Sequence, residues 1–104
     1  MAQQYIGTGR ISGTTQTISV SAASAQATNA FGAQTRQVRL CGNTAFHAKV
    51  GSGSFSATTS DPFFPANSPE TITVTAGQKI AAIRASTNGL VTATDGTVTV
   101  TELE

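Results

Sequence analysis

The sequence has 104 residues and a formal net charge of +1, and only 11% of its residues are charged, compared with about 25% in a typical soluble domain. This length fits one domain, and a charge so close to zero gives no basic field for binding nucleic acid. No apolar run approaches the roughly 20 residues of a membrane span, and the opening MAQQY has no signal-peptide pattern. We therefore expect neither a nucleic-acid partner nor a membrane partner.

The apolar residues predict a thin hydrophobic core. Sixteen of them are alanines, which bury little area, and Leu, Ile, Val and Phe together number only 21. A fully buried large side chain stabilises the fold by about 1.5–3 kcal/mol, whereas ordering costs about 1–2 kcal/mol per residue. Because a partner that binds only the folded state adds to its stability, we expect this chain to work within an oligomer or a larger assembly.

Residues 1–13 contain three glycines and no sustained hydrophobic period. One interpretation is a frayed terminus. The other is an N-terminal arm laid across a neighbouring subunit and held by backbone pairing, as in strand addition. The interface anchors of such an arm would be Tyr5, Ile6, Arg10 and Ile11, and the β domain would then span residues 14–104.

Alternation of apolar and polar residues predicts strands through most of the remaining sequence. Turn signals at 42–43 (GN), 88–89 (NG) and 95–96 (DG) predict hairpins between neighbouring strands. Residues 22–33 are small and polar and indicate a loop, with a short helix as the alternative. The predicted strands are residues 14–21, 34–41, 44–50, 55–59, 70–75, 79–85, 90–94 and 97–103.

About eight short antiparallel strands separated by turns predict an all-β fold, a single small β-sandwich or jelly roll. Strand 34–41 would point Val38 and Leu40 into the core. Strand 44–50 would point Phe46 inward and His47 outward. Residues 79–85 are apolar on both faces, which is typical of a central strand.

Residues 61–70, which we call the strap, contain all three prolines and two of the five phenylalanines. Proline fixes φ and lacks a backbone donor, so the strap can be neither a helix interior nor a central strand. We expect a stiff, extended crossing between two halves of the domain. Its rings, Phe63 and Phe64, would serve either as core plugs or as interface anchors.

Few residues in this sequence could carry chemistry. His47 has no second histidine with which to bind a metal, and Cys41 alone cannot complete a metal site. Asp61 and Glu70 bracket the strap, but a catalytic carboxylate pair needs a cleft that a chain of this size can hardly enclose. We therefore predict no enzyme activity, no catalytic residues, no cofactor and no metal.

Five segments occur in a recognisable order in the later two thirds of the chain: QVRL (37–40), AFHAKVG (45–51), FPANSPE (64–70), VTAGQKI (74–80) and VTEL (100–103). In this order they resemble a group of small all-β structural proteins encoded in tailed-phage and prophage genomes. The resemblance covers about residues 34–103. Segment 90–96 departs from the pattern, because an additional strand and turn are inserted there.

The resemblance implies a non-enzymatic virion protein, most simply a capsid decoration (cement) protein on the surface of the head, synthesised in the host cytoplasm. It would stabilise the head by bridging major capsid subunits as a homo-oligomer, expected to be a trimer. A tail, head–tail connector or fibre component is an alternative. A glycan- or receptor-binding β-sandwich module is another, although the chain lacks tryptophan and has one tyrosine for an aromatic platform.

Overall fold

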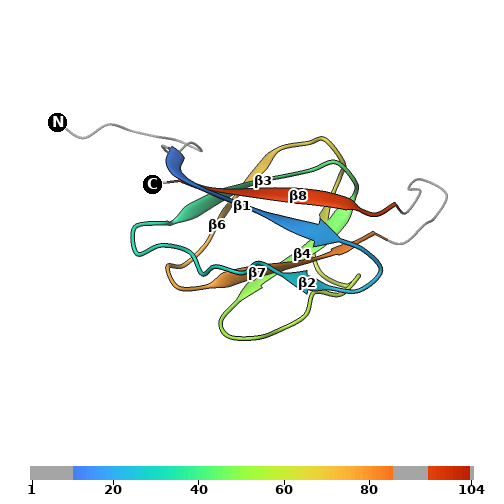
Figure 1. The fold of residues 1–104 in the computed structure, drawn as a ribbon, viewed down its shortest axis with the longest axis horizontal. Coiled ribbons are helices and arrows are strands. Elements are labelled where there is room, and N and C mark those ends of the chain that lie inside the picture. Colours follow the sequence, from blue (N-terminus) through green and yellow to red (C-terminus); the bar gives the residue numbers. More distant parts are fainter. Residues whose placement is uncertain (1–10, 86–93, 104) are drawn as a thin grey trace.

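A computed structural model describes residues 11–85 and 94–103. This part of the chain consists of strands joined by turns and loops and has no helix, hence none that could cross a membrane. The strands, labelled in Figure 1, are β1 (Ile11–Val20), β2 (Ala25–Gln26), β3 (Gln37–Gly42), β4 (Phe46–Gly51), β5 (Phe63–Phe64), β6 (Glu70–Thr73), β7 (Lys79–Arg84) and β8 (Gly96–Leu103).

The strands form two antiparallel sheets of four strands each, which pack face to face as a small sandwich (Figure 1). Sheet A has the order β1-β8-β3-β6, and sheet B has the order β2-β7-β4-β5. The predicted all-β sandwich is therefore confirmed. The strand predicted to be central, β7, lies between β2 and β4.

The core lies between the two sheets and follows the alternation of the sequence. Val38 and Leu40 of β3 point inward, as predicted, and Phe46 and Ala48 of β4 meet them from the opposite sheet. Alanines occupy several inward positions of sheet B, which keeps the core thin. The buried core residues are Ile18, Val20, Ala27, Phe31, Val38, Leu40, Phe46, Ala48, Phe64, Val74, Ile80, Ala82, Val98 and Val100.

The predicted hairpin across the turn at 42–43 is wrong. β3 pairs with β6 and β8 in sheet A, whereas β4 pairs with β5 and β7 in sheet B. The chain crosses from one sheet to the other at Gly42, where a Cβ would lie 2.8 Å from the ring of Phe46. Alternation assigned the inward faces correctly, but it does not distinguish a hairpin from two strands that face each other across a core.

β8 does not form the predicted hairpin with a strand that precedes the Asp-Gly turn at 95–96. Both edges of β8 are already taken, by β1 on one side and β3 on the other. The Asp95 carboxylate instead forms an ion pair with Arg84 at 2.6 Å. The turn signal at 88–89 and most of the predicted strand 90–94 lie outside the described residues.

Four further elements differ from prediction. Residues 55–59 are not a strand. The Ala57 amide donates to the Ser24 hydroxyl at 2.8 Å and not to a carbonyl of a neighbouring strand. Two short edge strands were missed: β2, within the predicted loop, and β5, within the strap. β1 begins at Ile11, so the last three residues of the predicted arm belong to the sheet.

Candidate functional site

The strap is fastened to sheet B by β5, which is an edge strand of that sheet. β5 pairs Phe64 with Phe46 and Phe63 with His47. The Ala48 amide also donates to the Pro62 carbonyl at 3.1 Å. A segment flanked by prolines is tolerated at this position because the outer side of an edge strand needs no backbone donors.

The two neighbouring rings of the strap point to opposite faces of the sheet. Phe64 is only 6% exposed and stacks on Phe46, with ring centroids 5.0 Å apart and planes 8° from parallel. It is part of the core cluster. Of the two roles expected for the strap rings, Phe64 therefore takes that of core plug.

Phe63, in contrast, is 45% exposed and is the exposed large hydrophobic side chain of the described residues. Its ring meets the imidazole of His47 edge to face at 5.4 Å. His47 Nδ1 lies 2.8 Å from the Asp61 carbonyl oxygen, and because a carbonyl can only accept, Nδ1 is the donor. The Asp61 carboxylate in turn accepts from the Thr58 amide at 2.8 Å. Hydrogen bonds therefore stabilise the turn that immediately precedes Phe63.

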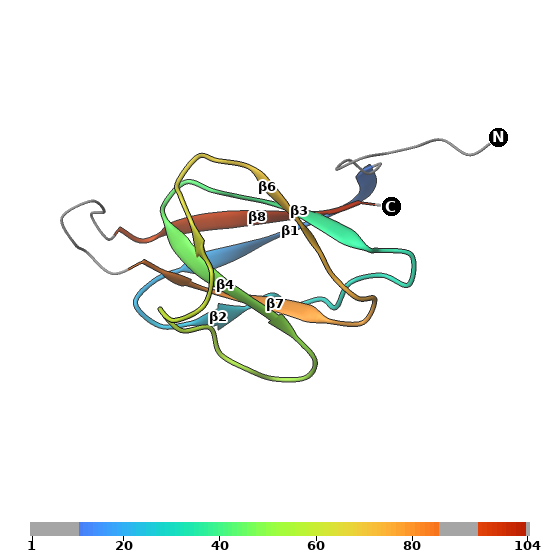
Figure 2. The same ribbon diagram turned by 180° about the vertical axis from the view of Figure 1, so that it is seen from behind.

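The outer face of sheet B beside Phe63 is covered by the chain itself. Figure 2 shows the segment after β4 running along the outside of this sheet. Gln26 Nε2 donates to the Gly53 carbonyl at 2.7 Å, and Lys49 Nζ lies 5.9 Å from the centre of the Phe55 ring. Ala81, which alternation places on this outer face, is fully buried. The segment after β4 thus covers part of the outer face of sheet B, and Phe63 remains 45% exposed beside it.

Glu102 is a buried carboxylate that sequence reasoning did not single out. It lies on the same inward face of β8 as Val98 and Val100, and it is 3% exposed. Its Oε1 accepts from the Gly32 amide at 2.9 Å and from the Thr35 hydroxyl. Because buried charge requires hydrogen-bonding partners, we assign Glu102 a structural role in tying the turn before β3 to the end of β8.

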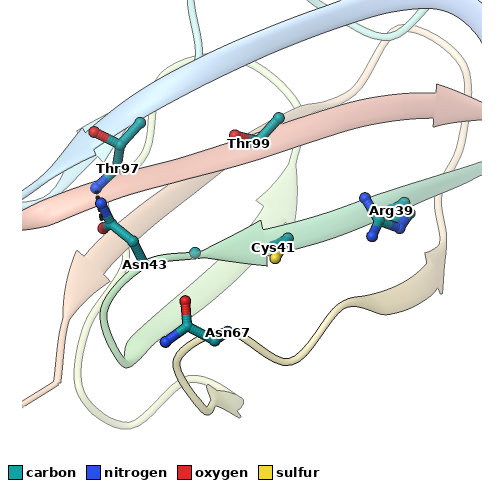
Figure 3. A pocket seen from close by; sticks show the side chains of 7 residues that line it. Arg39, Cys41, Asn43, Asn67, Thr97 and Thr99 are labelled. Atoms are coloured by element: carbon teal, nitrogen blue, oxygen red, sulfur yellow. Dashed lines mark hydrogen bonds between the residues drawn. The ribbon is translucent and has the colours of Figure 1, made fainter.

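A hollow of about 350 Å³ opens on the outer face of sheet A (Figure 3). Two neighbouring strands of that sheet and the strap contribute to it, and its side chains are mostly polar. Cys41 and Thr99 are direct partners in the β3–β8 register. The lining residues are Arg39, Cys41, Gly42, Asn43, Asn67, Thr97 and Thr99.

Two asparagines are fixed at the rim of this hollow by backbone contacts. The Asn43 amide donates to the Thr97 carbonyl at 3.1 Å, and the Thr97 amide donates to Asn43 Oδ1 at 2.8 Å (Figure 3). Asn67 has a left-handed φ of 59°, and its amide donates to the Gly42 carbonyl at 2.7 Å. Asparagine tolerates this conformation better than most residues, so the strap reaches the end of β3 at this point.

Three of the six predicted interface anchors lie within the described residues, and they belong to different parts of the fold. Ile11 opens β1 in sheet A, where it pairs with Leu103. Phe63 lies in sheet B and Phe64 is inside the core. The other three anchors, Tyr5, Ile6 and Arg10, lie outside the described residues.

Sequence reasoning also missed the hollow, although its strands were predicted. The polar alternation of β3 and β8 was visible in the sequence, but their pairing was not. Among residues 11–85 and 94–103, no three His, Cys, Asp or Glu side chains are grouped in a way that could hold a metal ion. No protein-family model, curated protein or solved structure matches this chain.

Proposed function

We propose that this chain is a structural subunit of a tailed-phage particle, a decoration protein that binds the outside of the head as a homo-oligomer and bridges major capsid subunits. The order of segments from QVRL to VTEL supports this role through its resemblance to phage structural proteins. In the structure, the observation that carries the proposal is the division of the strap rings, Phe64 into the core and Phe63 outward.

Phe63 has the properties of a binding anchor. Aromatic side chains dominate the energetics of protein interfaces, and they bind best where little ordering is required. The Phe63 backbone is held by pairing with β4 and by the adjacent proline, so its ring is ordered before a partner arrives. His47, half-buried at its edge, would supply a polar contact beside the ring.

The rest of the described surface suits a subunit in an array better than a free monomer. The chain has 18 threonines and 10 serines but only 11 acidic and basic side chains. Such a surface has little charge repulsion to oppose close packing. Each subunit would contribute a modest contact, and many copies on one shell would together hold it through multivalency.

The test is binding to heads assembled from the genome that encodes this chain after deletion of its own gene. The full chain should sediment with these heads, and Phe63→Ala should bind at least tenfold more weakly. Thr17→Ala, an exposed substitution on sheet A, is the matched control and should bind normally. Equal binding of the chain and Phe63→Ala would reject the anchor, and failure of the chain to bind heads would reject the decoration role.

Intact particles distinguish a location on the head from a location on the tail. Gold-labelled chain seen on tails or at the neck instead of on the head would favour the tail or connector alternative. A variant lacking residues 1–10 tests the arm, because it keeps all of β1. If the arm is part of the interface, this variant should lose head binding while its far-UV circular dichroism stays that of a β-sandwich.

A further inference from the structure

We propose that the hollow on the outer face of sheet A binds a sugar that carries a carboxylate, a uronic-acid-type residue, through an unpaired arginine set among fixed amides and hydroxyls. Most of its lining belongs to sheet A, whereas Phe63 lies in sheet B, so the two proposals rest on different side chains.

Arg39 supplies the charge complementarity. Its guanidinium has no hydrogen bond or ion pair with any part of the chain that the structure describes. No acidic side chain lines the hollow. Glu70, on the adjacent β6, is the register partner of Leu40, which faces the core. Its side chain therefore leaves the backbone on the face of sheet A opposite to the hollow. A planar guanidinium with free donors fits a carboxylate through two parallel hydrogen bonds.

The asparagines supply groups that recognise sugar hydroxyls. Asn43 uses its Oδ1 to accept from Thr97, which leaves its NH2 group to donate to a ligand. The side chain of Asn67 makes no hydrogen bond within the described part of the chain and can both donate and accept. Both are held by their backbone contacts, so little further ordering is needed for them to bind.

Thr97 and Thr99 complete the site with two hydroxyls on one face of β8 (Figure 3). Successive outward residues of a strand lie about 6.6–6.8 Å apart, so this pair can contact two positions on one sugar ring. The volume of about 350 Å³ is at the small end for ligand sites. It therefore suits one sugar residue, either free or as part of an acidic polysaccharide.

Other ligand classes fit this hollow less well. A protein interface would have an apolar centre built from large side chains, and no aliphatic or aromatic side chain lines this hollow. A phosphate is usually held by several cations or by a nest of backbone amides, whereas this hollow has one cation. A uronic acid combines one negative charge with several hydroxyls, and this combination matches one arginine surrounded by side-chain amides and hydroxyls.

The experiment is an NMR titration of the 15N-labelled full chain with sodium glucuronate, with glucose, sodium acetate and inorganic phosphate in parallel. Glucuronate should shift the Asn43 and Asn67 side-chain signals and the Thr97 and Thr99 backbone amides in a saturable manner. Glucose lacks the carboxylate that would bind Arg39, and acetate lacks the hydroxyls that would bind the asparagines and threonines. Each should therefore bind at least about tenfold more weakly than glucuronate. A glucuronate oligosaccharide tests whether the polymer is the preferred source.

Arg39→Gln should lower glucuronate affinity at least about tenfold and leave the spectrum folded. Arg36→Gln, which removes the same charge outside the hollow, is the matched control and should bind as the unaltered chain does. The proposal is overturned if glucuronate gives no saturable shift, if acetate or phosphate binds as tightly, or if Arg39→Gln leaves affinity unchanged. Head binding, tested separately, is unaffected by any of these outcomes.

Discussion

The two rings of the strap allow a sharp comparison, because Phe63 and Phe64 are the same residue type at adjacent positions. Replacing Phe64 with alanine removes a ring that is 94% buried and stacked on Phe46. A Phe→Ala change in a core costs about 3–5 kcal/mol, including the cavity that remains. Phe63 is 45% exposed and leaves no closed cavity, so its loss should cost about 1 kcal/mol of folding stability.

These losses can be measured by urea unfolding followed by far-UV circular dichroism, since the chain has no tryptophan for fluorescence. In thermal melts, Phe64→Ala should lower Tm by at least about 12 °C, and Phe63→Ala by about 4–8 °C. Total stabilities of about 5–15 kcal/mol mean that Phe64→Ala could unfold the chain. Phe64→Leu, expected to cost less than about 1.5 kcal/mol, then gives a folded comparison.

The stacking itself is tested by a double-mutant cycle between Phe46→Leu and Phe64→Leu. We expect a coupling of about 0.5–1.5 kcal/mol beyond the separate losses. If Phe63→Ala destabilises the chain as much as Phe64→Ala, the assignment of one ring to the core and the other to the surface is refuted.

Three further substitutions test particular contacts. Gly96→Ala would place a Cβ 2.7 Å from Thr44 Cγ2 and against Asn43 Oδ1, so chemical denaturation should show a loss of about 1–3 kcal/mol in the free energy of unfolding. Glu102→Ala strands two donors and should cost at least about 2 kcal/mol, more than Glu102→Gln, which retains an acceptor; equal losses would mean that the hydrogen bonds are not the cause. Arg84→Gln breaks an exposed ion pair and should cost about 0–1 kcal/mol, with less effect in high salt.

The faces of the strands could be predicted from the sequence, because a period of two fixes which residues point inward. Val38, Leu40 and Phe46 all occupy the predicted side. The sheet to which each strand belongs could not be predicted in this way. Two strands that meet across the core have the same alternation as two strands that pair through a turn.

The candidate site was only partly predictable for a related reason. The prolines of the strap indicated an extended crossing, but they did not indicate the edge strand β5 that lies within it. Which of its two rings would be buried depends on the register between β5 and β4, a contact between residues far apart in the sequence. The hollow depends on three such contacts, because β3, β8 and the strap meet only in the folded chain.

The central claim is that this chain acts as part of a larger shell. Electron cryo-microscopy of intact particles, produced from the genome that encodes it, tests this most directly. We predict repeated density for a two-layer β-sandwich on the outer surface of the head, with Phe63 turned toward the shell. Particles that contain no copy of the chain would contradict the account.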